Sequence, residues 1–210
     1  SSKILVSIVT PCYNSKGTIL QTVSSVSDQT FSNIEHFIVD GKSSDGTEEL
    51  LNANKQLFTK LISESDFGIY DAINKGIKLS SGDIIGVLNS DDLFSAPTII
   101  ESIVEVFQNN NIDALYGDVV FVKPENPDRI VRYYSSKKFN PDKFKYGYMP
   151  AHPSFYARRE LFEKFGYYKT DYTIAADFEL LVRFLYVNRI KYKYVEMPFV
   201  KMRTGGISTR

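Results

Sequence analysis

The chain has 210 residues and no formal net charge, with 43% hydrophobic and 24% charged residues, an ordinary composition for one globular domain. It contains no run of about 18 apolar residues, which excludes a membrane-spanning helix, and no compact basic run, which argues against nucleic-acid binding. The single cysteine, Cys12, excludes an internal disulfide and fits a reducing compartment, so we expect a cytoplasmic protein.

Strands and helices alternate in the first 122 residues. The apolar periodicity predicts strands at 4–10, 36–39, 61–62, 84–88 and 114–122, with helices at 19–26, from 47 onward, at 70–79 and at 97–107. Such alternation is typical of a Rossmann-like, mainly parallel sheet flanked by helices. After residue 122 we expect a strand at 129–134, helices at 159–165 and 177–188, and an extended segment at 192–202. The segment 135–151 shows little periodicity and is predicted to be a loop.

The two parts of the chain differ in charge. Residues 1–122 carry 7 Lys or Arg and 16 Asp or Glu, a net charge of −9, and residues 123–210 carry 18 and 9, a net charge of +9. One interpretation is simply two halves that attract each other. The other is an acidic, metal-holding half beside a basic half that faces an anionic substrate or a membrane surface.

Polar side chains follow each of the first four predicted strands. The first strand leads to the segment 10–14, the second to Asp40, the third to Asp66, and the fourth to Asp91 and Asp92. Ligands bind beyond the carboxyl ends of the strands in an open α/β sheet, so we expect these groups to line one site. The chain has neither a Gly-x-Gly-x-x-Gly nor a Walker-type Gly-Lys-Ser/Thr sequence, and therefore no cationic phosphate cradle.

Asp91 and Asp92 directly follow a buried apolar strand. Paired carboxylates suit Mg²⁺ or Mn²⁺ that holds a diphosphate. The alternative is a surface turn whose aspartates cap the helix near Pro97, which is the commoner role of an isolated Asp-Asp pair. The missing phosphate cradle favours the metal site, because a metal must then neutralise the phosphates.

Two residues of the second half are further candidates. Asp177 begins an amphipathic helix, where it either caps the helix or removes a proton from an attacking hydroxyl group. His152 lies between Pro150 and Pro153, and a structural role and a ligand-side role are equally compatible with that position.

These segments, in this order, resemble the inverting GT-A glycosyltransferases of family 2. The matching segments are Val6-Ser7-Ile8-Val9-Thr10-Pro11-Cys12-Tyr13-Asn14, Val39-Asp40-Gly41-Lys42-Ser43-Ser44-Asp45-Gly46-Thr47, Gly82-Asp83-Ile84-Ile85-Gly86-Val87-Leu88-Asn89-Ser90-Asp91-Asp92, His152-Pro153-Ser154-Phe155 and Ala176-Asp177-Phe178-Glu179-Leu180. The segment 66–76 is similar to a subgroup of bacterial cell-surface polysaccharide enzymes. The resemblance implies one GT-A domain over 1–210, with a nucleotide-sugar and metal-binding half at 1–122 and an acceptor-binding half at 123–210.

The resemblance also implies roles for individual residues. The donor would be held by residues of the first half, namely Thr10, Pro11, Tyr13 and Asp40 around the nucleoside and Asp66, Asp71 and Lys75 at its border. Asp40 would accept the N–H of the base. Asp91 and Asp92 would be the last two positions of the Asp-x-Asp metal motif, with Asp92 as the direct ligand and Asp91 nearer the ribose or a metal-bound water. Asp177 would be the catalytic base, and His152 and Arg203 would lie on the acceptor or diphosphate side.

Three departures from the family pattern stand out. Gly41 stands where many relatives have a second acid, so Asp40 would act alone. Ile73 stands where many relatives have an arginine, so Lys75 and Arg203 become the candidates for contact with the donor phosphates. Relatives also usually continue beyond the segment 205–208, so we expect a truncated C-terminus.

The function implied is metal-dependent, inverting transfer of a hexosyl or N-acetylhexosaminyl group. The donor would be a nucleoside-diphosphate sugar, UDP-linked, and the acceptor a hydroxyl group of a saccharide or lipid-linked saccharide in polysaccharide biosynthesis. The alternative is a nucleotide-sugar-binding protein without turnover. A nucleotidyltransferase is disfavoured, because the segment 10–14 is not a glycine-rich basic loop. A peripheral contact with the inner face of the membrane and a homodimer both stay open.

Overall fold

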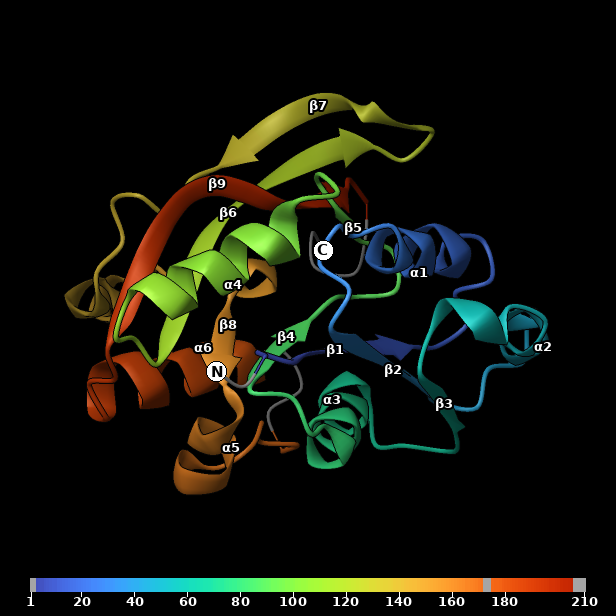
Figure 1. The fold of residues 1–210 in the computed structure, drawn as a ribbon, viewed down its shortest axis with the longest axis horizontal. Helices are drawn as coiled ribbons and strands as arrows, with labels where there is room; N and C mark the ends of the chain where they lie inside the picture. Colours follow the sequence, from blue (N-terminus) through green and yellow to red (C-terminus); the bar gives the residue numbers. More distant parts are fainter. Residues whose placement is uncertain (1–2, 172–174, 206–210) are drawn as a thin grey trace.

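A mixed β-sheet forms the centre of the computed structural model, which describes residues 3–171 and 175–205. Within these residues the sheet has nine strands in the order β3-β2-β1-β4-β8-β6-β9-β5, and β7 pairs with β6 (Figure 1). The strands are β1 (Val6–Cys12), β2 (Ile34–Asp40), β3 (Lys60–Ser63), β4 (Ile84–Val87), β5 (Leu93–Phe94), β6 (Ala114–Lys123), β7 (Asn126–Tyr134), β8 (Tyr156–Arg158) and β9 (Tyr192–Arg203).

The helices are mostly short. The α-helices are α1 (Ile19–Ser27), α2 (Thr47–Asn52), α3 (Ile69–Leu79), α4 (Ile99–Asn109), α5 (Arg159–Phe165) and α6 (Ala176–Leu181). Among the described residues, the short 3-10 helices are η1 (Lys55–Leu57), η2 (Pro141–Tyr146) and η3 (His152–Ser154), and the π-helix η4 (Val182–Val187) continues α6. The helix expected at 177–188 is therefore two helical segments of different winding.

The first four predicted strands pair as expected. The strands β3, β2, β1 and β4 lie side by side and parallel. Every residue of β1 is buried, as is typical of a parallel strand covered by helices on both faces. Since β1, β2, β3 and β4 run in one direction, their carboxyl ends lie at one edge of the sheet.

The second half of the chain completes the sheet with strands of both directions. The strand β8 is antiparallel to β4 and to β6, whereas β6 and β9 are parallel. Neither β5 nor β8 was expected, since strands of two and three residues are too short to show a periodicity. The predicted loop at 135–151 contains η2, because Phe144 is buried there against Phe139 and Phe178.

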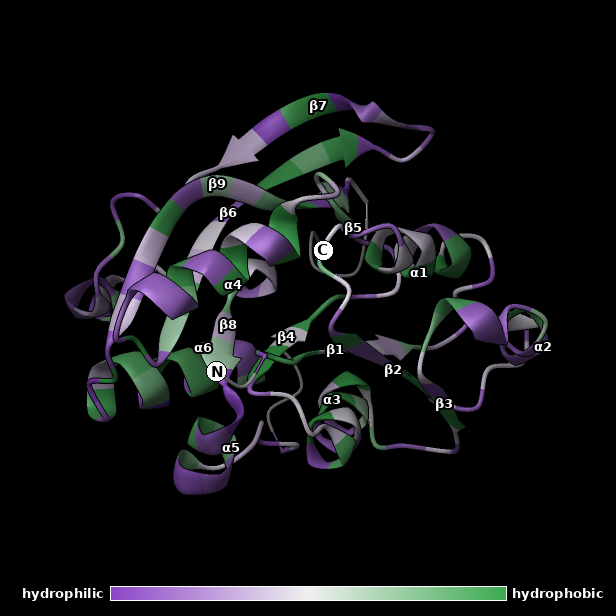
Figure 2. Ribbon diagram, in the orientation of Figure 1, coloured by the Kyte–Doolittle hydropathy of each residue, from purple (hydrophilic) through white to green (hydrophobic). Residues whose placement is uncertain are grey.

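Helices cover both faces of the sheet. One face packs against α3, α5 and α6, and the other against α4, with α1 beside it (Figure 1). The ribbon of α4 changes between hydrophobic and hydrophilic along its turns (Figure 2), as expected of a helix with one buried side. No helix among the described residues has the length and apolar character needed to cross a membrane. Gly206 and the residues after it lie outside the described part.

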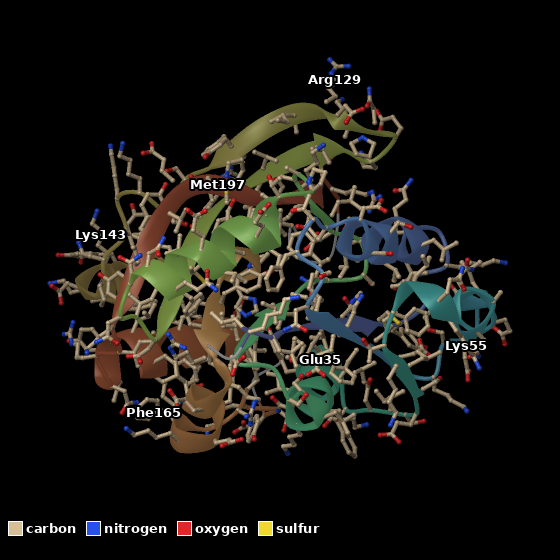
Figure 3. All side chains as sticks on the ribbon, in the orientation of Figure 1. Glu35, Lys55, Arg129, Lys143, Phe165 and Met197 are labelled. Atoms are coloured by element: carbon tan, nitrogen blue, oxygen red, sulfur yellow. The ribbon has the colours of Figure 1, made fainter. Side chains whose placement is uncertain are left out.

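The positive charge of the second half is spread over the surface. Arg129 at β7 and Lys143 at η2 project from widely separated parts of the molecule (Figure 3). These two residues therefore do not belong to one basic surface.

Gly86 of β4 leaves room for the buried ring of Tyr156 on β8. A Cβ atom at position 86 would overlap that ring, whereas a Cβ atom at Gly17 meets nothing within 4 Å. We expect Gly86→Ala to lower the free energy of unfolding by about 1–3 kcal/mol, the usual cost of overpacking a core. Urea unfolding measures this loss, with Gly17→Ala as the matched control. Equal stability of the two variants would contradict the tight packing of β4 on β8.

Candidate active site

Residues that follow β1, β2 and β4 meet at the carboxyl edge of the sheet. Cys12 and Asp40 are partners at the ends of β1 and β2. Beyond β1, the Oγ atom of Ser15 lies 2.8 Å from that of Ser90, which follows β4, and Thr18 Oγ1 donates to the Ser90 carbonyl oxygen at 2.9 Å. The structure therefore joins the end of β1 to the end of β4, as expected for one site.

The residues predicted around a nucleoside differ in exposure. Thr10 is fully buried, and its Oγ1 atom lies 2.7 Å from Nε2 of His36. Burial lowers the pKa of His36 to about 3, so this imidazole is neutral at pH 7. Pro11 is buried as well, whereas Tyr13 is 62% exposed. Of these residues, Tyr13 offers an aromatic ring to a ligand.

The carboxylate of Asp40 is fully buried and surrounded by donors. It accepts hydrogen bonds from the backbone N–H of Ser43 at 3.0 Å, the hydroxyl of Ser63 at 2.8 Å and the thiol of Cys12 at 3.4 Å, and also from the Ser43 hydroxyl. Burial, followed by the charge of Asp40, raises the pKa of the Cys12 thiol. Cys12 therefore stays protonated and is a poor nucleophile.

Three of the predicted donor residues lie in or just before α3, with Asp66 in the preceding loop and Asp71 and Lys75 in the helix. Asp66 lies against Gly41, so that a Cβ atom on Gly41 would be 2.7 Å from Oδ2 of Asp66. The ammonium group of Lys75 lies 3.1 Å from Oε1 of Glu64 and 3.6 Å from Oδ2 of Asp71. The positive charge of Lys75 is thus already compensated by two acids.

The turn at Asp91 and Asp92 does not cap α4. The N-terminal cap of α4 is Thr98, and the side chain that accepts a backbone N–H in the first turn is that of Gln29, whose Oε1 atom lies 3.0 Å from the nitrogen of Ile100, so the capping interpretation is wrong. Instead, Thr22 of α1 holds the turn, because its single hydroxyl proton is shared between the carbonyl oxygens of Asp92 and Ser90, which lie 2.7 Å and 2.9 Å from Oγ1. The turn is therefore anchored by its backbone.

The side chain of Asp92 is buried without a complete set of partners. The residue is 2% exposed, and among the described residues its Oδ2 atom has no hydrogen-bond partner. Burial, followed by the nearby charge of Asp91, raises the pKa of Asp92 well above its usual range, against the opposing effect of Arg203. A buried acid with an unpaired oxygen is costly, which makes Asp92 a candidate for contact with a bound cation.

These two acids fit a divalent cation that is also bound by a ligand. The described residues contain no group of three or more His, Cys, Asp or Glu side chains arranged to hold a metal. The protein would therefore supply only Asp92 and Asp91, and phosphate oxygens and water would complete the coordination, as is common for Mg²⁺. The unpaired Oδ2 atom of Asp92 is the observation that fits this arrangement.

Arg203 of β9 connects the second half of the chain to this turn. Its guanidinium group donates to the backbone carbonyl oxygen of Asp91 and to the side chain of Gln21 on α1. The residue is largely buried. Arg203 thus lies beside the turn of Asp91 and Asp92, and its contacts position that turn.

Asp177 lies in the first turn of α6, beside a group of aromatic residues. The N-terminal cap of α6 is Ala175, so Asp177 is not the capping residue. Burial, followed by the charge of Asp177, raises the pKa of Tyr70 to about 12 and also raises that of Tyr168. Burial lowers the pKa of His152, with Asp177 acting in the opposite direction. The carboxylate of Asp177 therefore faces a tyrosine–histidine group from the second half and from α3.

Hydrogen bonds order this group. Nε2 of His152 lies 2.6 Å from the hydroxyl of Tyr168, whose ring stacks on Tyr70 at 5.7 Å between centroids. Asn74 of α3 binds the backbone of Tyr168 twice, accepting from its N–H at 3.0 Å and donating to its carbonyl oxygen at 2.8 Å. Tyr70 and Asn74 lie in the segment 66–76, but the sequence pattern does not distinguish them as site residues. No sequence pattern indicates Tyr168.

Comparison with known proteins identifies the family. The sequence model described as Glycosyl transferase family 2 matches residues 7–166. An uncharacterized glycosyltransferase of Mycobacterium tuberculosis is 34% identical over 185 residues, which cover 85% of this chain and 68% of that protein. The UDP-Glc:alpha-D-GlcNAc-diphosphoundecaprenol beta-1,3-glucosyltransferase WfgD of Escherichia coli is 36% identical over 115 residues, 54% of this chain and 45% of WfgD.

Solved structures share the fold at low sequence identity. TarS of S. aureus in complex with UDP-GlcNAc superimposes with a TM-score of 0.79 and 18% identity, over 97% of this chain and 59% of that one. The mannosyltransferase PcManGT of Pyrobaculum calidifontis, in complex with GDP-Man and Mn²⁺, gives 0.69 and 19%, over 97% and 57%. The chain thus spans less than two thirds of these solved chains, and its fold is the expected GT-A fold. Together with the family match over residues 7–166, this establishes that the chain belongs to glycosyl transferase family 2.

Proposed function

We propose that the chain transfers a sugar from a UDP-linked donor to a hydroxyl group of a saccharide or lipid-linked saccharide, with inversion at the anomeric carbon, in bacterial polysaccharide biosynthesis. Family membership supports glycosyl transfer. The printed names of similar proteins support the finer assignment: TarS was solved with UDP-GlcNAc, and WfgD uses UDP-Glc and a lipid diphosphate-linked acceptor.

One observation carries the proposal: the unpaired, buried carboxylate oxygen of Asp92 at the end of β4. A buried carboxylate oxygen is costly without a hydrogen-bond donor or a cation as its partner. A divalent cation bound together with a diphosphate would satisfy this oxygen, and the leaving group of the reaction would then lie at this edge of the sheet. A bound Mg²⁺ or Mn²⁺ would supply charge stabilisation for the departing diphosphate.

Other residues of the chain have separate roles in the proposed reaction. Tyr13 packs against the base, and Asp91 lies on the ribose side of the metal motif. Asp177 accepts the proton of the acceptor hydroxyl as that oxygen attacks the anomeric carbon. The attack comes from the face opposite the diphosphate, so one displacement inverts the configuration. The Tyr168 and His152 pair keeps the acceptor side ordered beside Asp177.

Lys75 and Arg203 have supporting roles in this proposal. Both stand near the donor, but Lys75 is paired with Glu64 and Asp71, and Arg203 holds the backbone of Asp91. In this proposal both residues hold the donor-binding loops in place. Either side chain would have to leave its present partners to contact a phosphate directly.

A panel of nucleotide sugars tests the proposal. With Mn²⁺ present, we expect release of UDP from one UDP-linked sugar, by slow hydrolysis without an acceptor and faster when a saccharide acceptor is added. The measurement is a coupled assay of free nucleotide, with GDP- and dTDP-linked sugars in parallel. Calorimetric binding of UDP without any release of nucleotide from the whole panel would favour the non-catalytic binding protein.

A further inference from the structure

Large apolar side chains lie exposed around η2 and at the end of η4. Tyr146 is 69% exposed, Val187 is 66% exposed and Tyr186 is 45% exposed. A single exposed apolar residue is ordinary on a protein surface, whereas several that lie together indicate a contact site. We call this region, which consists of residues 138–146 and 186–189, the η2–η4 surface.

Two contacts join the two segments of this surface. Arg189, which follows η4, has its Nη2 atom 3.7 Å from Oδ1 of Asp142 in η2. The guanidinium group of Arg189 also lies over the ring of Tyr186, with its Cζ atom 4.5 Å from the ring centroid. The two segments are therefore neighbours in space although they are distant in the sequence.

Basic side chains surround the exposed rings. The ammonium group of Lys145 lies 5.1 Å from the ring centroid of Tyr146, and that of Lys143 donates to the backbone carbonyl oxygen of Lys138. The η2–η4 surface contains four basic side chains and one acid, and that acid is the partner of the arginine. Tyrosine rings among basic side chains are typical of a protein surface that contacts anionic lipid head groups.

The inner side of η2 is packed against the protein. Phe144 is buried, and its ring contacts those of Phe139 and Phe178 edge-on, at 4.9 Å and 5.5 Å between centroids. This packing holds η2 in place, so its outer side chains start from a fixed backbone. A surface that is already ordered loses less conformational freedom when it binds.

The η2–η4 surface adjoins the candidate base of the reaction. Phe178, which packs on Phe144 of η2, directly follows Asp177 in α6. The nucleotide half extends in another direction, since Lys143 of η2 and Lys55 of η1 project from opposite ends of the molecule (Figure 3). A large flat partner on this surface would therefore lie beside the acceptor side.

We propose that the η2–η4 surface binds the anionic head groups of a phospholipid bilayer as a peripheral contact. The basic side chains attract the lipid phosphates, while Tyr146, Tyr186 and Val187 enter the head-group layer. The exposed rings and the valine favour a bilayer over an acidic protein or polysaccharide, because only a bilayer offers an apolar layer beneath its negative charge. Lipid binding itself goes beyond the proposed function, whereas its use to bring Asp177 to a lipid-linked acceptor rests on that function.

Sedimentation with lipid vesicles tests the proposal. We expect the natural protein to bind vesicles of phosphatidylcholine and phosphatidylglycerol in equal parts, but not vesicles of phosphatidylcholine alone. Salt at about 1 M should release it, because charges are then screened beyond about 3 Å. Lys143→Glu/Lys145→Glu should weaken binding at least about twentyfold, since each cation near an anionic lipid surface contributes about fivefold.

Two further variants separate the charge from the rings and from the rest of the molecule. Tyr146→Ala leaves the charge unchanged and should still weaken vesicle binding, because the ring no longer enters the head-group layer. Lys55→Glu/Lys60→Glu reverses two exposed lysines of the first half and is the matched control, which should bind like the natural protein. Circular dichroism of each variant establishes that it is folded.

The lipid contact and the proposed function fail in distinguishable ways. No binding to the anionic vesicles, or equal binding by Lys143→Glu/Lys145→Glu and the control, would overturn the lipid contact. A dimer that this variant separates, without vesicle binding, would make the surface an interface between two copies and would overturn it as well. Hydrolysis of a UDP-linked sugar in solution tests the proposed function without any lipid, and Lys143→Glu/Lys145→Glu should retain it. Vesicle binding by a protein that releases no nucleotide from any donor would support the lipid contact and contradict the proposed function.

Discussion

Asp177→Asn is expected to abolish sugar transfer while UDP binding stays nearly unchanged. Asparagine is close to isosteric with aspartate but cannot take up the proton of the acceptor hydroxyl. Loss of a general base lowers the rate by about 10²- to 10⁴-fold. The residue lies on α6, beside Tyr168 and His152, whereas Asp91 and Asp92 follow β4, so the turn that carries these two acids keeps its contacts.

The measurement is a turnover rate at saturating donor together with a calorimetric affinity for UDP. Glu160→Gln on α5 changes another acid of the second half, exposed on the surface, and should behave like the natural protein. Transfer at the natural rate by Asp177→Asn would remove Asp177 from the mechanism. A loss of UDP affinity equal to the loss of rate would instead assign Asp177 to donor binding.

Asp92→Asn is expected to have opposite effects on binding and on stability. Burial raises the pKa of Asp92 in the folded protein, so the folded state binds a proton more tightly than the unfolded state does. Stability therefore falls as pH rises from about 4, the usual pKa of the free carboxyl, toward the raised value in the folded state. Asparagine is neutral throughout, and in the presence of a chelator at pH 8 the variant should melt a few degrees higher than the natural protein.

The same substitution should remove the effect of the metal. Mn²⁺ with UDP should raise the melting temperature of the natural protein, because a ligand that binds only the folded state stabilises it. The variant should show almost no such rise and should lose metal-dependent UDP binding. Thermal melting at pH 4 and pH 8, with and without Mn²⁺, measures both effects. A melting temperature that is lower than natural at pH 8 without metal would contradict the strained, unpaired state of Asp92.

Opposite signs of these two effects would identify Asp92 as a residue kept for binding at the expense of stability. A protein fold seldom retains a buried carboxylate oxygen without a partner unless a ligand completes it. Asp118 of β6 is a useful contrast: it is also fully buried, but it accepts hydrogen bonds from the hydroxyls of Tyr133 and Tyr194 and from the backbone of Ser136. Asp118 lies within β6 and Asp92 in the turn that follows β4, and their hydrogen-bond partners distinguish the structural acid from the candidate ligand.

Local patterns accounted for the parallel half of the sheet. The apolar runs that became β1, β2 and β4 are long enough to show a periodicity, and each is followed by polar residues at the edge where parallel strands bind ligands. The short strands β5 and β8 could not be found in this way, since their pairing depends on β9 and on β4 and β6, which are distant in the chain.

The sequence by itself determined the family, the α/β class and the set of acids at the strand ends, because these depend on residue types and on local periodicity. Only the tertiary structure decided which of these carboxylates have their oxygen atoms occupied by hydrogen-bond donors. Asp40 and Asp66 look equivalent as strand-end carboxylates, yet one is surrounded by donors from three strand ends and the other is open beside Gly41. The physical reason is that the hydrogen-bond partners of a buried carboxylate come from segments far apart in the chain, and folding alone brings them together.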